Sequence, residues 1–147
     1  MMWPMPETTF SAFSALSPFL LQWPDSELAS VTVDSPTTLR LRFAAAFGHR
    51  VPDGVAGYLS PVELVFHGAT WQGDDPALCL GGIAHGTVRV DGAPVGPAAH
   101  VSALPVDRRG AVVCEFRLIS GTALRIDALH LVGSVDGAAR FRESFAC

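Results

Sequence analysis

One histidine, one tryptophan and three carboxylates fall within the stretch VELVFHGATWQGDD, from Val62 to Asp75. A little further along the chain, the stretch GIAHGTVRV adds His85 and Arg89. Imidazole and carboxylate groups are common ligands of zinc, iron and copper, and they are also the usual general acids and bases. Whether these side chains act together depends on the elements that position them.

Both stretches alternate between apolar and polar residues with the period of two that is typical of β-strands. The first stretch should direct one set of side chains inward, Val62, Leu64 and Phe66, and another set outward, Glu63, Val65, His67, Ala69 and Trp71. We expect the two strands to pair as antiparallel neighbours. An even register then places His67 opposite His85 and Glu63 opposite Arg89, with Cβ atoms about 4.5–5.5 Å apart.

This pairing predicts one surface that carries an aromatic ring, two imidazoles and an acid–arginine pair. Such a face suits a planar or sugar-like ligand, or a protein partner that is anchored by an aromatic residue and an arginine. The predicted ligand- or partner-binding residues are Glu63, His67, Trp71, His85 and Arg89.

Three other interpretations of the same residues remain open. His67 and His85 could bind a metal ion together with Asp74, although their spacing matches no established metal motif. Asp74, Asp75 or Glu63 could act in acid–base catalysis beside His67, but adjacent aspartates in a glycine-flanked loop are more often turn residues. The third interpretation is a plain cross-strand ladder whose face is covered by a neighbouring subunit or by the N-terminal segment.

The other histidine and cysteine residues give weaker signals. His130 is expected to lie across from Glu143, in a terminal hairpin that turns at Asp136-Gly137. The three cysteines, Cys79, Cys114 and Cys147, show no CxxC spacing, so neither a disulfide framework nor a zinc knuckle is indicated. We expect reduced thiols in the cytoplasm.

Short alternating segments with regular turn signals continue along most of the chain. Residues 28–33 and 39–43 should form a hairpin, and a second hairpin should set Phe116 opposite Leu124 and Cys114 opposite Ile126. A shift of parity after Ile126 predicts a β-bulge near residues 127–128. We therefore predict one all-β domain over residues 1–147, an antiparallel β-sandwich or partly closed barrel of seven to eight strands.

The N-terminal segment differs from the remainder in its periodicity. Apolar residues between Phe10 and Leu20 recur near helical spacing, which predicts a short helix or turn over residues 10–22 after a flexible tail at 1–9. The segment has no positively charged start and contains Glu7 and several prolines, so we do not expect export.

The amino-acid composition limits the classes of partner that we expect for this chain. Hydrophobic residues make up 49% of the chain and charged residues only 16%, which favours a homo-oligomer that buries further apolar surface. The net charge of −4 and the scattered arginine pairs give no footprint for nucleic acid. No apolar run approaches the ~18 residues of a membrane span.

The chain contains arginine but no lysine, which excludes Schiff-base chemistry, pyridoxal phosphate attachment and the lysine of a phosphate-binding loop. There is no GxSxG nucleophile motif, and no cofactor is indicated. The arginine-rich, lysine-free usage is typical of a bacterial source with high GC content.

We predict a bacterial binding or interaction module without catalytic activity. The alternative is a small metal- or carboxylate-dependent enzyme that uses His67, His85 and Asp74 or Asp75.

Overall fold

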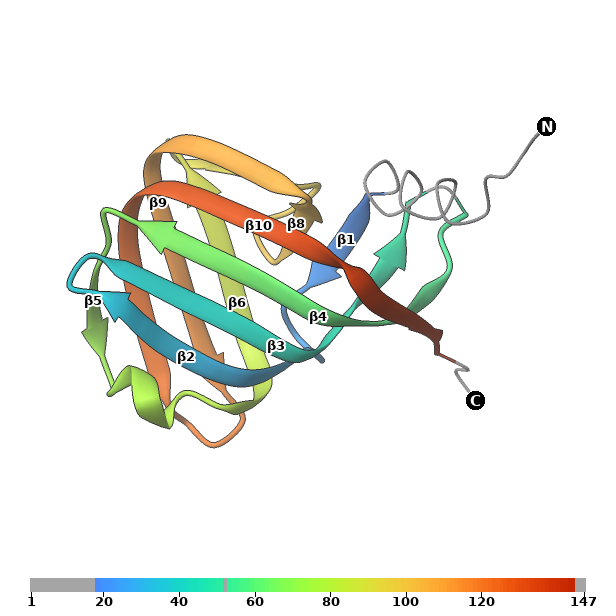
Figure 1. Ribbon diagram of the computed structural model, residues 1–147, viewed down its shortest axis with the longest axis horizontal. Helices are drawn as coiled ribbons and strands as arrows, with labels where there is room; N and C mark the ends of the chain where they lie inside the picture. The colour runs from blue at the N-terminus through green and yellow to red at the C-terminus, as the bar shows by residue number, and fades with distance from the viewer. Residues whose placement is uncertain (1–17, 52, 145–147) are drawn as a thin grey trace.

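The computed structural model describes residues 18–51 and 53–144, and this part of the chain consists almost entirely of antiparallel β-structure (Figure 1). The strands are β1 (Phe19–Gln22), β2 (Glu27–Ser35), β3 (Thr38–Arg50), β4 (Ala56–His67), β5 (Thr70–Gly73), β6 (Gly81–Val90), β7 (Ala93–Pro94), β8 (Val101–Leu104), β9 (Val106–Leu118) and β10 (Ala123–Glu143). One 3₁₀ turn, η1 (Pro76–Leu78), precedes β6. No helix within these ranges is both long and apolar enough to cross a membrane.

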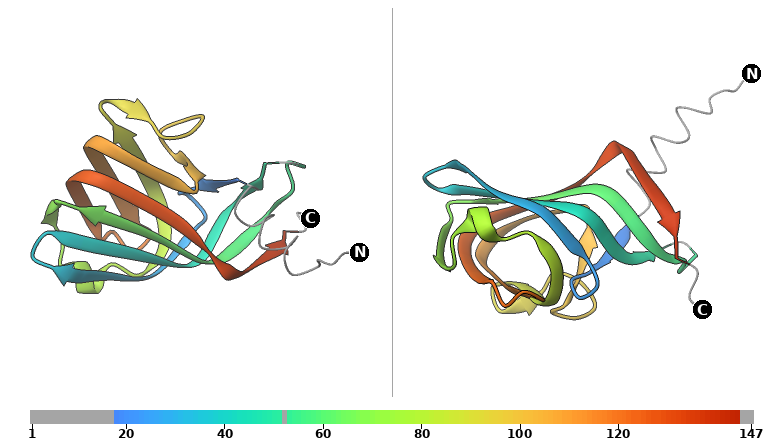
Figure 2. Two further views of the ribbon diagram at one scale, coloured as in Figure 1. Left: turned by 45° about the horizontal axis from the view of Figure 1, so that its top comes forward. Right: turned by 90° about the horizontal axis from the view of Figure 1, so that it is seen from below.

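Six strands pair in a closed cycle, β2–β3–β4–β10–β9–β6, and β6 returns to β2. The curvature of the sheet is visible in the right-hand view of Figure 2. The contact between β2 and β6 is short, since only Glu27 with Gly82 and Leu28 with Gly81 are paired there. Strands β1 and β8 extend the sheet beyond the far end of β3. The sheet is therefore a barrel closed by a short seam.

The alternating sequence pattern fills the interior of this barrel. Val62, Leu64 and Phe66 on β4 are fully buried, as their parity predicts. On β9 and β10, Phe116 pairs with Leu124 in the predicted register. The pairing of these strands shifts immediately after Ala128, next to the predicted bulge.

Trp23, between β1 and β2, occupies the centre of the core and is fully buried. Its ring packs edge-on against Phe43, with centroids 5.4 Å apart, and stacks on Phe116 at 6.3 Å. The indole Nε1–H donates a hydrogen bond to Ser102 Oγ at 3.0 Å. Gly86 is required beneath the indole because a Cβ there would lie 2.7 Å from the Trp23 side chain.

The all-β prediction is confirmed, but the described residues form ten strands instead of the seven or eight expected, and several of these strands are long. Residues 45–61, which include Pro52-Asp53-Gly54, belong largely to β3 and β4, and the turn-like segment Asp107-Arg108-Arg109-Gly110 lies inside β9. The terminal hairpin at Asp136-Gly137 is also wrong, because β10 continues to Glu143 with only a register irregularity between Val135 and Arg140. Long barrel strands absorb turn-forming residues as bulges.

Of the helix predicted at residues 10–22, the structure describes residues 18–22, and these residues do not form a helix. Residues 19–22 form β1, which pairs with β3 and β8 and buries Phe19 and Leu21. Two neighbouring strand edges satisfy its backbone groups, and this outweighs the helical spacing of the apolar residues. The predicted tail at residues 1–9 and the remainder of the predicted helix up to residue 17 lie outside the described residues.

We predict that Ser102→Ala destabilises the fold by about 1–3 kcal/mol, because it leaves the buried indole N–H of Trp23 without an acceptor. Urea denaturation measures this loss. Ser134→Ala, at an exposed position on β10, is the matched control and should change the free energy of unfolding little. In a Trp23→Phe background the Ser102→Ala substitution should cost much less; an equal cost in both backgrounds contradicts the assignment.

Candidate functional site

The predicted pairing of His67 with His85 is wrong. β4, which carries His67, pairs with β3 and β10, whereas β6, which carries His85, pairs with β2, β7 and β9. Two strands therefore separate the histidines in either direction around the barrel. The intervening strand β5 pairs with β10, so the chain reaches β6 by crossing the end of the barrel rather than by a hairpin.

Trp71 does not share the outer face of His67. Gly68 has a left-handed backbone conformation, with φ at 62°, and this residue breaks the alternation between β4 and β5. Trp71 consequently pairs with Ile126 and packs against the core. Its predicted role as an exposed aromatic platform is not supported by this position.

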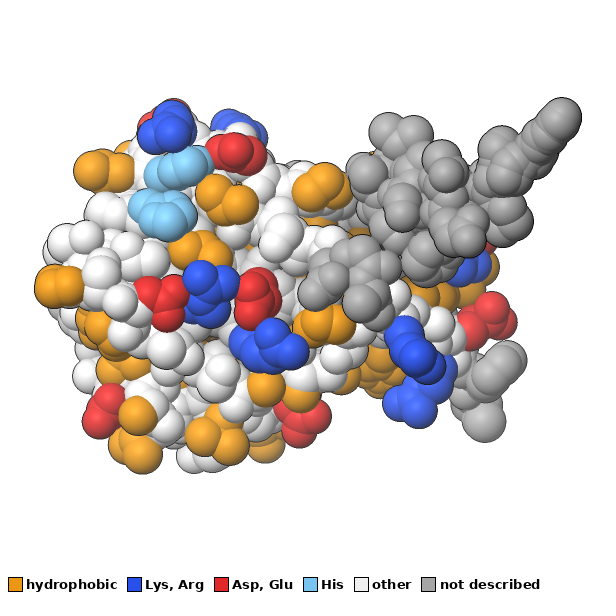
Figure 3. All heavy atoms as spheres, in the orientation of Figure 1, with side chains coloured by type: hydrophobic (Ala, Val, Ile, Leu, Met, Phe, Trp, Pro, Cys, Tyr) orange, Lys and Arg blue, Asp and Glu red, His pale blue; other side chains and the backbone are white. Residues whose placement is uncertain are grey.

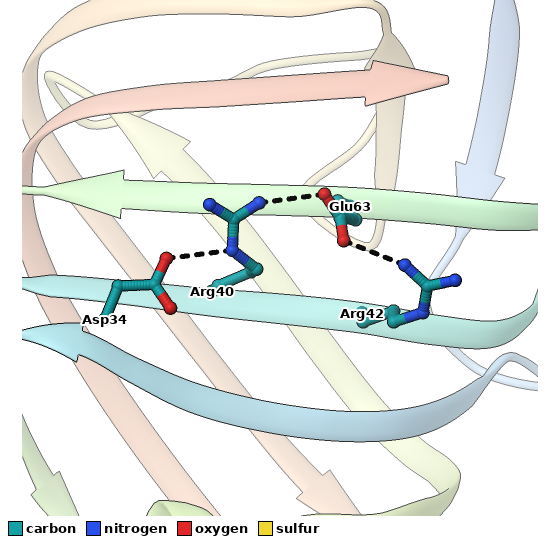
Figure 4. Close-up of polar contacts among 4 residues, drawn as sticks. All are labelled: Asp34, Arg40, Arg42 and Glu63. Carbon is teal, nitrogen blue, oxygen red and sulfur yellow. Dashed lines mark hydrogen bonds and ion pairs between the residues drawn. The ribbon is translucent and has the colours of Figure 1, made fainter. Parts of the chain in front are cut away.

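Glu63 pairs with arginines other than the predicted Arg89. One Glu63 oxygen lies 2.8 Å from Arg40 Nη1 and the other lies 3.0 Å from Arg42 Nη1 (Figure 4). Arg40 also donates from Nε to Asp34 at 2.8 Å, and this hydrogen bond raises the pKa of the Arg40 guanidinium. The four side chains form an alternating ladder across the outer face of β2, β3 and β4.

Asp74 and Asp75 hold the backbone at the end of the barrel. The Asp74 carboxylate accepts a hydrogen bond from the Ala123 N–H at 2.8 Å, and Asp75 accepts one from the Ala77 N–H at 2.9 Å as the cap of η1. Nearby, burial and the charges of these two aspartates raise the pKa of Cys79 to about 11, so its thiol is protonated at neutral pH. These residues act as structural turn residues.

A metal site with three or more histidine, cysteine, aspartate or glutamate ligands is absent from the described ranges 18–51 and 53–144. The predicted ligand set of His67, His85 and Asp74 is thus not assembled. Cys114 is fully buried in the core, where desolvation raises the pKa of its thiol.

The outer face of β5, β10, β9 and β6 carries a groove of about 400 Å³ that is open to solvent. We call it the β9 groove, and its side chains come from cross-strand rows on that face. The rows that frame it are His85 with Arg117, and Thr87 with Glu115, Arg125 and Gln72.

One cation in the β9 groove has no ion-pair partner among the described residues. Arg125 donates two hydrogen bonds of 3.1 Å to Asp127, which lowers the pKa of that carboxyl, and lies 3.6 Å from Glu115. Arg117, by contrast, forms no ion pair with any described residue, and neither does Arg89 on the neighbouring strand β6. The groove therefore presents an uncompensated guanidinium beside the exposed imidazole of His85.

A second polar cluster lies on the outer face of β4, β10 and β9. His67 and His130 are cross-strand partners whose ring centroids are 5.3 Å apart. Figure 3 shows histidine side chains side by side on this face, with charged side chains around them. His130 Nε2 is hydrogen-bonded to Asp107 Oδ1 at 2.6 Å. The predicted partner Glu143 instead pairs with Gly57, at the other end of β10.

Comparison with known proteins finds no matching family model, no similar curated protein and no similar solved structure. The function is therefore inferred from the geometry and charge of these two outer-face clusters.

We predict that a double-mutant cycle couples Glu63 to Arg42 and not to Arg89. Glu63→Gln should destabilise the fold by about 0.5–1 kcal/mol at low salt and by less at high salt, as for other partly exposed ion pairs. In an Arg42→Gln background the loss should shrink, and in an Arg89→Gln background it should be unchanged. Urea denaturation of the five variants measures the coupling, and coupling to Arg89 would restore the pairing expected from the sequence.

Proposed function

We propose that this chain is a non-catalytic binding module that docks an acidic segment of a partner protein in the β9 groove. The observation that carries the proposal is Arg117, a guanidinium without an ionic partner among the described residues, at the edge of a groove of about 400 Å³. An unpaired guanidinium provides a fork of donors that matches the geometry of a carboxylate.

The shape of the β9 groove favours a protein partner over a small ligand. Sites for small molecules are typically concave and bury most of the ligand surface. The β9 groove is open to solvent and is lined by residues from β5, β6, β9 and β10. An extended peptide with acidic side chains can lie across such a surface and exchange water for arginine contacts.

Two of the residues selected from the sequence belong to this proposal. His85 lines the β9 groove, and Arg89 projects from the exposed side of β6 as a flanking positive charge. His67, on β4, lies outside the β9 groove, and Glu63 and Trp71 have partners of their own. The alternative of an enzyme loses support, since its residues His67, His85 and the two aspartates occupy separate parts of the barrel.

The test is a titration of ¹⁵N-labelled protein with a hexaglutamate peptide at low salt, followed by NMR. Amide shifts should concentrate at Thr87, Glu115 and Arg117. Arg117→Gln should weaken binding by about 5–10-fold, because a charge-assisted contact is lost. Arg108→Gln is the matched control on the same strand outside the groove, and it should weaken binding less than about twofold.

An equal loss in Arg108→Gln and Arg117→Gln would mean diffuse attraction and would contradict the proposal. Inorganic phosphate is titrated in parallel. Phosphate binding as tight as that of the peptide at the same amides would assign the groove to small anions instead of an acidic protein segment.

We also propose that the chain self-associates. Leu78, Leu80 and Ile119 are 63%, 58% and 77% exposed, and Ile119 is hydrogen-bonded to Gly82 close to Leu80, at one end of the barrel. Covering such side chains in a dimer removes apolar surface from water. Light scattering at micromolar concentration should give a mass above the 15.5 kDa of one chain, and Ile119→Glu should reduce it. A mass of one chain for the unmodified protein contradicts this proposal.

A further inference from the structure

We propose that His67 and His130 form a two-imidazole binding site for a first-row transition metal ion, and that Asp107 orients His130 within it. The site differs from the metal site considered from the sequence, because it pairs His67 with a histidine on β10 rather than with His85. It also does not involve the β9 groove.

The separation of the two rings fits one shared ion. A metal ion about 2.0–2.1 Å from a ring nitrogen lies about 3.2 Å from the centroid of that ring, so two centroids must be within about 6.4 Å of each other. The centroids of His67 and His130 are 5.3 Å apart. With both rings at that distance, the angle at the ion is about 110°, which suits tetrahedral coordination. The ring planes are inclined at 32° to each other, and rotation of the exposed His67 ring about χ2 would turn one of its nitrogens toward an ion bound by His130.

Asp107 supports this assignment because it is hydrogen-bonded to Nε2 of His130, which leaves the Nδ1 atom for the ion. The Nε2–H of His130 donates to Asp107 Oδ1 at 2.6 Å, which directs the Nδ1 lone pair away from Asp107. Histidine ligands of metal ions commonly donate their second N–H to a carboxylate, which fixes the tautomer and increases ligand basicity. The His130 side chain is 17% exposed, so the ring is held in place, while an ion can still reach it from solvent.

The bulge in β10 creates this juxtaposition. Ile126 and Ala128 point inward, and strict alternation would direct His130 inward as well. The register shift after Ala128 reverses the parity, so that Leu131 is buried and His130 stands on the outer face beside His67. Bulges that re-aim a side chain are frequent at functional sites.

The two imidazoles and the charged residues beside them determine which ion we expect and how tightly it binds. Imidazole ligands suit zinc, nickel and copper, and two protein ligands leave the remaining positions for water or for a donor from a bound molecule. Arg109 is the strand partner of His130 and opposes a cation, whereas the carboxylate of Asp107 attracts one. We therefore expect affinity in the range of about 1–100 μM for Zn²⁺ and tighter binding for Cu²⁺.

The experiment is calorimetric titration of the untagged full-length chain with ZnCl₂, together with ¹⁵N NMR of the histidine side chains. We expect one ion per chain and shifts of the His67 and His130 ring nitrogens. His67→Ala and His130→Ala should each weaken binding by at least about tenfold, and Asp107→Asn by about tenfold. His85→Ala is the matched control and should leave the affinity unchanged, because His85 is exposed on a distant strand.

The proposal is overturned if His85→Ala weakens binding as much as His67→Ala, or if the unmodified chain binds no Zn²⁺ below about 1 mM. Circular dichroism without metal checks that each variant is folded. If an alanine variant is unfolded, the glutamine variant replaces it. The ring-nitrogen shifts of the unmodified chain require no variant, and their absence at saturating Zn²⁺ also overturns the proposal.

Discussion

The burial of Trp23 is the constraint on which the rest of this barrel depends. Its indole contacts Phe43 on β3 and Phe116 on β9 and donates to Ser102 on β8, and Gly86 on β6 leaves the space that the ring occupies. Side chains and backbone from four strands, β3, β6, β8 and β9, therefore meet at one side chain. A tryptophan contributes more buried apolar area than other residues, but only if its N–H finds an acceptor, so position and orientation are fixed together.

Because core side chains fill the interior of the barrel, any binding site must lie on its outer face. The side chains that alternate inward from β4, β9 and β10 form one core with Trp23, and the buried polar side chains among the described residues are those of Ser26 and Ser102. On the outer face, neighbours are determined by strand order, because cross-strand partners lie closer than residues along one strand. Polar clusters such as Glu63 on β4 with Arg40 and Arg42 on β3 thus combine residues from paired strands.

Local pattern predicted the all-β class, the inward parity of Phe66 and the register of Phe116 with Leu124, because these depend on period and on short hairpins. It did not predict that β4 and β6 lie on opposite sides of the barrel. Strands that follow one another in sequence usually pair, but β5 intervenes here and pairs with β10, and two strands separate β4 from β6 in either direction around the barrel. The inward position of Trp71 depends on a single left-handed glycine, whose conformation the alternation pattern does not reveal.

Sequence reasoning did not bring Asp107 and His130 together, because their contact depends on how the long strands β9 and β10 run. Asp107 lies in the segment DRRG, whose composition is typical of a turn, yet the long strand β9 continues through it and brings Asp107 to His130. His130 in turn owes its outward direction to the bulge after Ala128. The parity shift after Ile126 was a visible signal of that bulge, and following it across the sheet would have placed His130 on the outer face. Identifying His67 as its partner additionally required the pairing of β4 with β10, which is long-range in sequence and is determined by closure of the barrel around Trp23.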